Sequence, residues 1–323
     1  VQSEWPQEGY VFNASLSRCE NGGTLSWDEE AKKVIMKSNT SDKCYVYFDI
    51  YVEPTLAEIC NGKTLANCIK ENVYTADGEN GLYYHDGVGT YTNASQEAGD
   101  NSYRYSGANP NNYVCFGSDA ATCPNDNLYR IIGLFDDDKD GIYNIKLIKN
   151  TSIGDYAWGS GNGNTWDSST KPDIRTTLNS TFLGTINSTW QSKIEMHTWK
   201  VGGTACNTST TVKDFYNTEI GSSSSSTTDS MKVGLMYVSD YGYAAAPSNW
   251  TTKLHNYENA TSTNWLYLGL VEWTISRSSD NTYGAFAVLD TGYVGYLTVT
   301  GPGPVCPSFY LESSVSITGG TGT

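Results

Sequence analysis

The chain has 323 residues, enough for one large domain or two unequal ones with a sizeable core. Its 35 acidic against 20 basic side chains give a formal charge of −15, which repels nucleic-acid phosphates and anionic lipids and argues against partners of both kinds. Only 17% of the residues are charged, whereas tyrosine alone accounts for 24. Together with abundant Asn, Ser, Thr and Gly, this composition is typical of a protein rich in strands and turns rather than of a helical cytosolic enzyme.

Residues 1–54 predict a small β module. Short β-prone runs alternate with turn clusters, and the runs are 11–12, 24–27, 33–36 and 45–48. Residues 55–72 then predict a helix, either a linker or the first helix of a second domain over 73–323. The apolar face of this helix comprises Leu56, Ile59, Leu65 and Ile69.

The second domain is predicted to be rich in loops, with a few firm elements. Two strands over 127–135 and 142–148 enclose an acidic loop, which indicates a hairpin. A helical pattern over 173–199 is interrupted near Gly184, and the Ser-rich run after Gly221 is typical of a flexible loop. Further β-prone runs follow at 233–239, 265–275 and 307–317.

The eight cysteines fall into pairs, which predicts disulfides and an oxidising compartment. The pairs expected from spacing are Cys19 with Cys44, Cys60 with Cys68 and Cys115 with Cys123. Zinc is the weaker alternative, because no pair has metal-ligand spacing and the histidines lie far from the close pairs. No apolar run approaches the roughly 18 residues of a membrane span. We therefore expect an extracellular, cell-surface chain whose mature form does not span the membrane.

Three aspartates at alternate positions precede Gly141, as in the first half of a calcium-binding loop; they are Asp136, Asp138 and Asp140. The last position of such a loop requires a bidentate glutamate, but it is Leu147, inside the second predicted strand. An acidic hairpin tip is therefore the favoured interpretation. We expect no cofactor, and calcium at these aspartates is the alternative that stays open.

The sequence contains no recognisable catalytic motif. None of its histidines lies in a nucleophile motif, and no Gly-rich phosphate loop precedes a helix. A carboxylate pair for glycoside hydrolysis would need two of Asp240, Glu272 and Asp290 to converge, and such a pair is defined by its separation in space. We therefore expect binding without turnover and assign no catalytic residue.

Three stretches in the C-terminal third resemble successive landmarks of the C-type-lectin-like fold. They are 233–244, 265–276 with Glu272-Trp273-Thr274 inside it, and 307–311. The formylglycine-generating enzymes and their relatives show a similar order, but their active-site cysteines have no counterpart here, which argues against their catalysis. The resemblance implies an α+β, β-rich fold, with a C-type-lectin-like domain preceded by a small disulfide-stapled β module.

More closely, the chain resembles bacterial cell-surface proteins whose C-terminal lectin-like domain is diversified by diversity-generating retroelements. The counterpart of their variable segment is 285–304, where a chemically mixed set of residues is interleaved with valines. Cys306 replaces the arginine expected before Pro307, and we predict that it pairs with the otherwise solitary Cys206. The resemblance implies a ligand-binding surface made of Tyr283, Ala287, Leu289, Asp290, Tyr293, Gly295, Tyr296, Leu297, Thr298, Thr300, Gly301 and Gly303.

These observations predict a protein that binds a protein or glycan ligand at a cell surface, with tyrosine rings as rigid contact area. The interleaved Val288, Val294 and Val299 should be buried, because a segment accepts many side chains only where they point to solvent. Phe286 and Phe309 should anchor its ends. Two alternatives stay open: a structural subunit that self-assembles into a surface filament or layer, and, less favoured, an enzyme acting on glycans.

Overall fold

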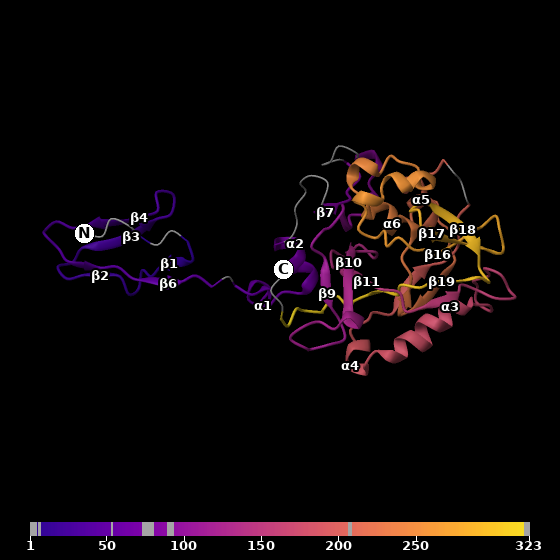
Figure 1. The fold of residues 1–323 in the computed structure, drawn as a ribbon, viewed down its shortest axis with the longest axis horizontal. Coiled ribbons are helices and arrows are strands. Elements are labelled where there is room, and N and C mark those ends of the chain that lie inside the picture. The colour runs from indigo at the N-terminus through magenta and orange to yellow at the C-terminus, as the bar shows by residue number, and fades with distance from the viewer. Residues whose placement is uncertain are drawn as a thin grey trace. The chain divides into compact units, whose positions relative to one another are not determined.

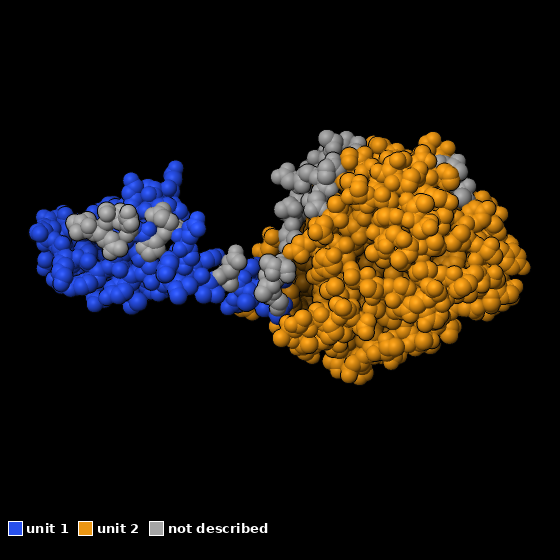
Figure 2. Space-filling view, in the orientation of Figure 1, with its two compact units in different colours: residues 1–59, 319–322 blue, residues 60–318, 323 orange. Residues whose placement is uncertain are grey.

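The computed structural model divides the chain into two compact units (Figure 2). Unit 1 comprises residues 1–59 and 319–322, and unit 2 comprises 60–318 and 323. The structure describes Trp5 and residues 8–52, 54–72, 81–88, 94–205 and 209–319. Both units contain several short antiparallel sheets, so the protein is β-rich, as the sequence predicts.

Unit 1 consists of three two-stranded sheets. They pair β1 (Tyr10–Phe12) with β6 (Phe48–Ile50), β2 (Arg18–Cys19) with β5 (Cys44–Tyr45), and β3 (Thr24–Asp28) with β4 (Lys33–Lys37). The rings of Phe12, Trp27 and Phe48 pack together with centroids 5.4 to 6.5 Å apart. No described residue of unit 1 is buried, so this aromatic cluster is a partial core at most.

The helix predicted over 55–72 is divided into α1 (Leu56–Ile59) and α2 (Leu65–Asn72). Between them, Gly62 has a φ of +77°, a left-handed conformation that glycine adopts without strain and that interrupts a helix. In α2, Leu65 and Ile69 are buried in the core of unit 2. α2 is therefore the first helix of the second unit and not part of a linker.

The largest sheet of unit 2 has the strand order β15-β20-β11-β10-β8-β7, with β9 paired to β10 as a seventh strand. β10 and β11 are almost entirely buried and form the predicted hairpin. The strands are β7 (Gly81–Tyr84), β8 (Tyr103–Ser106), β9 (Tyr113–Cys115), β10 (Leu128–Phe135), β11 (Asn144–Lys149), β15 (Val233–Gly234) and β20 (Ser308–Tyr310).

A buried helix, α6 (Val238–Ala244), lies between this sheet and a three-stranded one (Figure 1). The second sheet has the order β16 (Glu272–Arg277), β17 (Gly284–Val288) and β18 (Val294–Thr298). α6 contacts β8 of the first sheet and both β16 and β17 of the second, and α5 (Val212–Glu219) packs on α6. Two further strand pairs are β12 (Asp155–Ala157) with β19 (Pro302–Pro304) and β13 (His197–Lys200) with β14 (Thr228–Met231).

In the structure, the helical pattern predicted over 173–199 is divided into four short helices that end before β13. It comprises α3 (Asp173–Thr176), the π-helix η3 (Thr177–Phe182), the 3₁₀ helix η4 (Leu183–Thr185) and α4 (Ser188–Gln191). The other 3₁₀ helices are η1 (Ala94–Gln96), η2 (Asn125–Asn127), η5 (Pro247–Asn249), η6 (Leu254–Asn259) and η7 (Thr261–Thr263).

The β-prone runs predicted over 265–275 and 307–317 are strands only over 272–275 and 308–310. Before β16 the backbone is irregular, because polar side chains there bond to distant segments. Asn264 donates to the Tyr241 carbonyl at 2.9 Å, and the Trp265 indole donates to the Tyr105 carbonyl at 2.7 Å. Tertiary contacts thus override local strand propensity.

Three predicted disulfides are present, joining Cys19 to Cys44, Cys60 to Cys68 and Cys115 to Cys123. The fourth is not formed: Cys306 is a free thiol buried in the core of unit 2, and Cys206 lies outside the described residues. In the described part of the chain, no helix has the length and hydropathy needed to span a bilayer.

Candidate functional site

The predicted recognition segment is organised around the β17–β18 hairpin, in which β17 is the central strand of its sheet and β18 the outer one. The register pairs Val288 with Val294. These two valines and Val299 are buried, as predicted, and so are Phe286 and Phe309. The backbone of the segment is therefore anchored in the core by apolar side chains at intervals along its length.

Two tyrosine hydroxyl groups hold the turn between these strands. Tyr267 donates to the Asp290 carbonyl at 2.5 Å, and Tyr241 donates to the Gly292 carbonyl at 2.7 Å. Gly292 has a φ of +96°, and a Cβ at this position would lie 2.2 Å from Cγ2 of Thr261, so the turn requires glycine. The exposed carboxylate of Asp290 is thus presented from a fixed backbone.

The predicted binding positions differ in exposure. Tyr283, Asp290, Tyr296, Thr298 and Thr300 are exposed, whereas Leu289, Tyr293, Gly295, Leu297 and Gly301 are half-buried.

Ala287 and Gly303 are buried, so their predicted place on an exposed face is wrong. Ala287 belongs to the central strand, which is covered on both sides. Gly303 lies against the Trp273 indole, and a Cβ added to Gly303 would lie 2.8 Å from its Nε1.

The exposed positions of β18 share one face of the strand, because side chains at every second position point the same way. Tyr296 and Thr298 form this face, and the Tyr296 side chain is 42% exposed while its ring lies edge-on to Phe286 at 6.4 Å. The alternate residue Leu297 packs against the core. The exposed positions therefore occupy three turns and one strand face rather than the whole segment.

The three acids considered for glycoside hydrolysis lie in different environments. Asp240 is buried, with Oδ2 2.6 Å from the Lys146 amine and Oδ1 3.3 Å from the Arg104 guanidinium. Glu272 is buried in the core, and burial raises its pKa to about 8. Asp290 is exposed in the β17–β18 turn. Asp240 lines a pocket to which neither of the other two contributes.

The acidic tip of the β10–β11 hairpin is formed as predicted. Carboxylate oxygens of Asp136, Asp138 and Asp140 all lie within 4.8 Å of one another. Asp136 also accepts hydrogen bonds from the backbone N–H groups of Asp140 and Gly141, both at 3.0 Å. Carboxylates at this separation are able to share a cation. Asp136 also closes the loop through its two hydrogen bonds to the backbone.

Beside this tip is a pocket of about 840 Å³ that sequence reasoning missed. Its walls come from the β10–β11 loop, β13, α5 and the start of α6, and they include the rings of Phe135, Tyr216, Tyr237 and Tyr310. The acidic tip was visible in the sequence, but these neighbours are distant along the chain. No spacing rule joins segments so far apart, so only the fold reveals the pocket.

Buried ion pairs lie at the inner end of this pocket, where Asp100 and Asp240 contribute to its lining. Arg104 contacts both carboxylates, at 2.7 Å from Asp100 and 3.3 Å from Asp240. Burial raises the pKa of Asp100, but the Arg104 charge, the nearby His85 and the hydrogen bonds from Ser102 together outweigh this effect and lower it to about 2. Burial lowers the pKa of Lys146, and its pairing with Asp240 opposes that shift. Two cations and two carboxylates therefore balance one another here.

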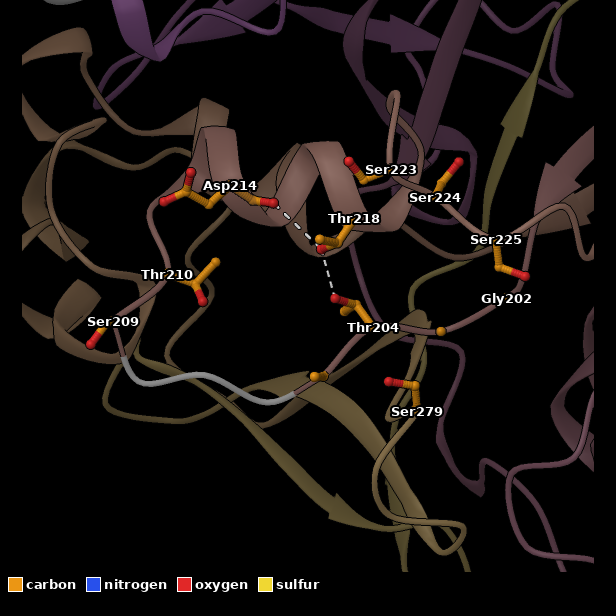
Figure 3. Close-up of a pocket in the computed structure, with 12 residues that line it drawn as sticks. Gly202, Thr204, Ser209, Thr210, Asp214, Thr218, Ser223, Ser224, Ser225 and Ser279 are labelled. Carbon is orange, nitrogen blue, oxygen red and sulfur yellow. Dashed lines mark hydrogen bonds between the residues drawn. The ribbon is translucent and has the colours of Figure 1, made fainter.

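A second hollow, of about 760 Å³, is lined mainly by hydroxyl groups (Figure 3). Thr204 and Thr218 share a hydrogen bond of 2.6 Å, and Thr218 also donates to the Asp214 carbonyl at 3.4 Å. The Asp214 carboxylate accepts from Thr211 in the capping box of α5. Thr204, Thr218 and Asp214 are therefore linked by hydrogen bonds within the lining.

Comparison with known proteins yields no match. No protein-family model, curated protein or solved structure matches this chain, so no relative supplies a function for it.

Proposed function

We propose that the chain is an extracellular recognition protein with a C-type-lectin-like domain. Its ligand would bind to the recognition surface, defined as Tyr283, Asp290, Tyr296, Thr298 and Thr300. The supporting observation is a contrast within residues 283–304: the valines there are buried, whereas these five side chains are exposed. Such a segment tolerates changes at its exposed positions without loss of the fold, as retroelement diversification would require.

The chemistry of this surface suits binding. Tyr283 and Tyr296 are 53% and 42% exposed and offer rigid, amphipathic rings that lose little conformational entropy on contact. Asp290, Thr298 and Thr300 supply hydrogen-bonding groups beside them. Because the turn backbone is already held by tyrosine hydroxyl groups, little further ordering is needed on binding. The five side chains contain no paired nucleophile and base, which favours binding over turnover.

The three disulfides support the proposed location. Disulfides persist in oxidising compartments such as the cell exterior and are rare in the cytosol. We therefore place the recognition surface outside the cell, where its ligand would be a glycan or another surface protein.

Two substitution libraries test the proposal. One randomises the recognition surface, and the control library randomises Val288, Val294 and Val299. We expect most members of the first library to keep the wild-type melting temperature within about 4 °C, and most of the second to unfold well below it, because buried misfits cost about 1 to 3 kcal/mol each.

Ligand binding is then measured on glycan and surface-protein arrays. The variant Tyr283→Ser/Tyr296→Ser should lose about tenfold or more of the wild-type signal. An equal fall in melting temperature in the two libraries would show that the recognition surface belongs to the hydrophobic core. An unchanged array signal in the double variant would show that the ligand binds elsewhere.

A structural subunit is the second candidate, favoured by apolar side chains on unit 1. Tyr10, Val11, Ile50, Tyr51 and Val52 are all exposed, and among the described residues each strand of the β1–β6 pair has an outer edge without a strand partner. Open edges of this kind pair with other chains. Residues 1–4, 6 and 7, which precede β1, lie outside the described residues. Sedimentation at high concentration decides this point, because a filament subunit should form large species and a recognition monomer should not.

A further inference from the structure

We propose that the pocket beside the acidic hairpin tip is a second binding site, which takes a primary ammonium group on an aliphatic stem, such as a peptide lysine side chain. It shares no residue with the recognition surface. Its volume of about 840 Å³ is that of a small-molecule or side-chain site and is far larger than one ion requires.

One wall of the pocket is negatively charged, through Asp136, Asp137, Asp138 and Glu195. In the described part of the chain, the only salt bridges of these carboxylates are with His197, at 3.3 Å from Asp137 and 3.4 Å from Glu195. Two of the four carboxylates thus share one basic partner, which is charged only when protonated, and the other two form no salt bridge with a described residue. A ligand cation would relieve their mutual repulsion.

The pKa of His197 reflects the negative potential of the acidic wall. Its ring stacks on Tyr310 with centroids 3.7 Å apart. Burial lowers the pKa of His197, but its hydrogen bonds with Asp137 and Glu195 outweigh burial and raise it. The carboxylates therefore favour the protonated form of this ring at the edge of the pocket.

The rings of the pocket suit an ammonium group, and the chain itself provides an example. The amine of Lys146 lies 4.3 Å from the ring centroid of Tyr237, 5.2 Å from that of Tyr310 and 2.6 Å from Asp240. Both tyrosines also line the pocket, together with Phe135 and Tyr216. Aromatic faces attract ammonium groups, and their apolar area accommodates the methylene stem.

Three lysines also line the pocket but do not neutralise the acidic wall. The Lys213 amine donates to the Ala98 carbonyl at 2.5 Å. Lys200 stands three residues beyond His197 on β13, about 10 Å along the strand. Lys139 is exposed at the hairpin tip and forms no salt bridge in the described residues. The acidic wall therefore keeps unpaired carboxylates for a single ligand ammonium.

The test is a calorimetric titration of the whole chain at low ionic strength and pH 7. The probe is Nα-acetyl-lysine methylamide, and its uncharged match is Nα-acetyl-norleucine methylamide. We expect the lysine probe to bind about tenfold tighter than its match. The variant Asp138→Asn, which removes a charge without breaking a salt bridge, should weaken lysine binding severalfold, and Asp137→Asn/Asp138→Asn should weaken it about tenfold or more.

The matched control is Asp119→Asn, which removes an exposed carboxylate that belongs neither to the pocket nor to the recognition surface and should leave lysine binding unchanged. Melting curves of all variants confirm that they fold. Equal binding of the two probes, no binding of either, or equal losses in Asp138→Asn and Asp119→Asn would overturn the proposal. A parallel titration with calcium chloride completes the test: calcium binding without lysine binding would identify the tip as a metal site and overturn the ammonium assignment.

Discussion

Glu272 is a carboxyl group placed where charge is strongly disfavoured. It is buried, its Oε1 has no hydrogen-bond partner among the described residues, and the Cys306 thiol is its polar neighbour. Burial raises its pKa to about 8, and the hydrogen bond with Cys306 offsets only part of that shift. The folded protein therefore holds a neutral carboxyl group here at pH 7.

The pKa of Glu272 predicts how stability changes with pH. Because its folded pKa lies above the ordinary value near 4.5, its stabilising effect is complete below that value and is lost as pH rises towards and through 8. Between the ordinary value of 4.5 and the raised value of about 8, the free energy of unfolding should fall by roughly 1 kcal/mol per pH unit because of this group. The variant Glu272→Gln, which imitates the neutral form, should lack this loss.

Urea unfolding of both proteins at pH 5, 6.5 and 8 measures the effect. The stability of wild type relative to Glu272→Gln should fall steadily across the series. Parallel pH profiles would mean that Glu272 ionises normally, and then the packing around Cys306 would have to admit water.

Among the elements, α6 shows how distant groups produce a helix from a β-prone sequence. Its N-terminus is satisfied by two buried carboxylates: Asp240 accepts from the Tyr237 N–H at 2.8 Å, and Glu219 accepts from the N–H groups of Val238 and Ser239 at 2.8 and 3.0 Å. Helix N-termini favour anions, and these bonds satisfy donors that would otherwise be unpaired in the core. Asp240 also binds Lys146, so a single carboxylate joins α6 to β11.

We expect the Lys146 and Asp240 substitutions to be strongly coupled. Lys146→Met leaves a buried carboxylate without its nearest cation and should cost roughly 3 to 5 kcal/mol of unfolding free energy. In Lys146→Met/Asp240→Asn that charge is absent, so the double variant should be more stable than the sum of the two single effects predicts.

Urea midpoints of wild type, both single variants and the double variant give the coupling energy directly. Additive effects would show that the two side chains contribute independently. The surface pair of half-buried Lys63 and exposed Glu71, 2.6 Å apart, is a suitable control, because removing it should cost about 1 kcal/mol or less.

At the scale of the whole molecule, the two units differ in what stabilises them. Unit 2 has a continuous core of buried aliphatic and aromatic residues. Unit 1 has no buried residue in its described part and relies on short strand pairs, an aromatic cluster and the Cys19–Cys44 disulfide. Small units without a core depend on such covalent constraints.

Removal of that disulfide should therefore unfold unit 1 selectively. Closing this loop is worth about 3 kcal/mol, which is most of what so small a unit can have. In Cys19→Ser/Cys44→Ser, limited proteolysis should digest unit 1 while a fragment beginning near Cys60 survives, and the main thermal transition should be unchanged. The control Cys115→Ser/Cys123→Ser should leave unit 1 resistant. Survival of unit 1 without its disulfide would show that other contacts stabilise it.

Local patterns in the sequence determined the short-range features of this protein. Cysteine spacing predicted three disulfides, and the β-prone runs predicted β1, β3 and β4 of unit 1 and the β10–β11 hairpin, although they missed β2 and merged β5 with β6. The valine interleaving predicted which residues anchor the β17–β18 segment. Each of these features depends on residues close together along the chain, where spacing alone decides which side chains meet.

Tertiary structure decided the rest. Ala287 and Gly303 are buried because a central strand and a tryptophan ring cover them, and Val238 begins a helix because carboxylates from two segments cap it. The acidic pocket and the ion pairs beside it unite side chains from β10, β13, α5 and α6. Such contacts depend on how the chain packs in three dimensions, and no periodicity of a single segment encodes which distant residue will be its neighbour.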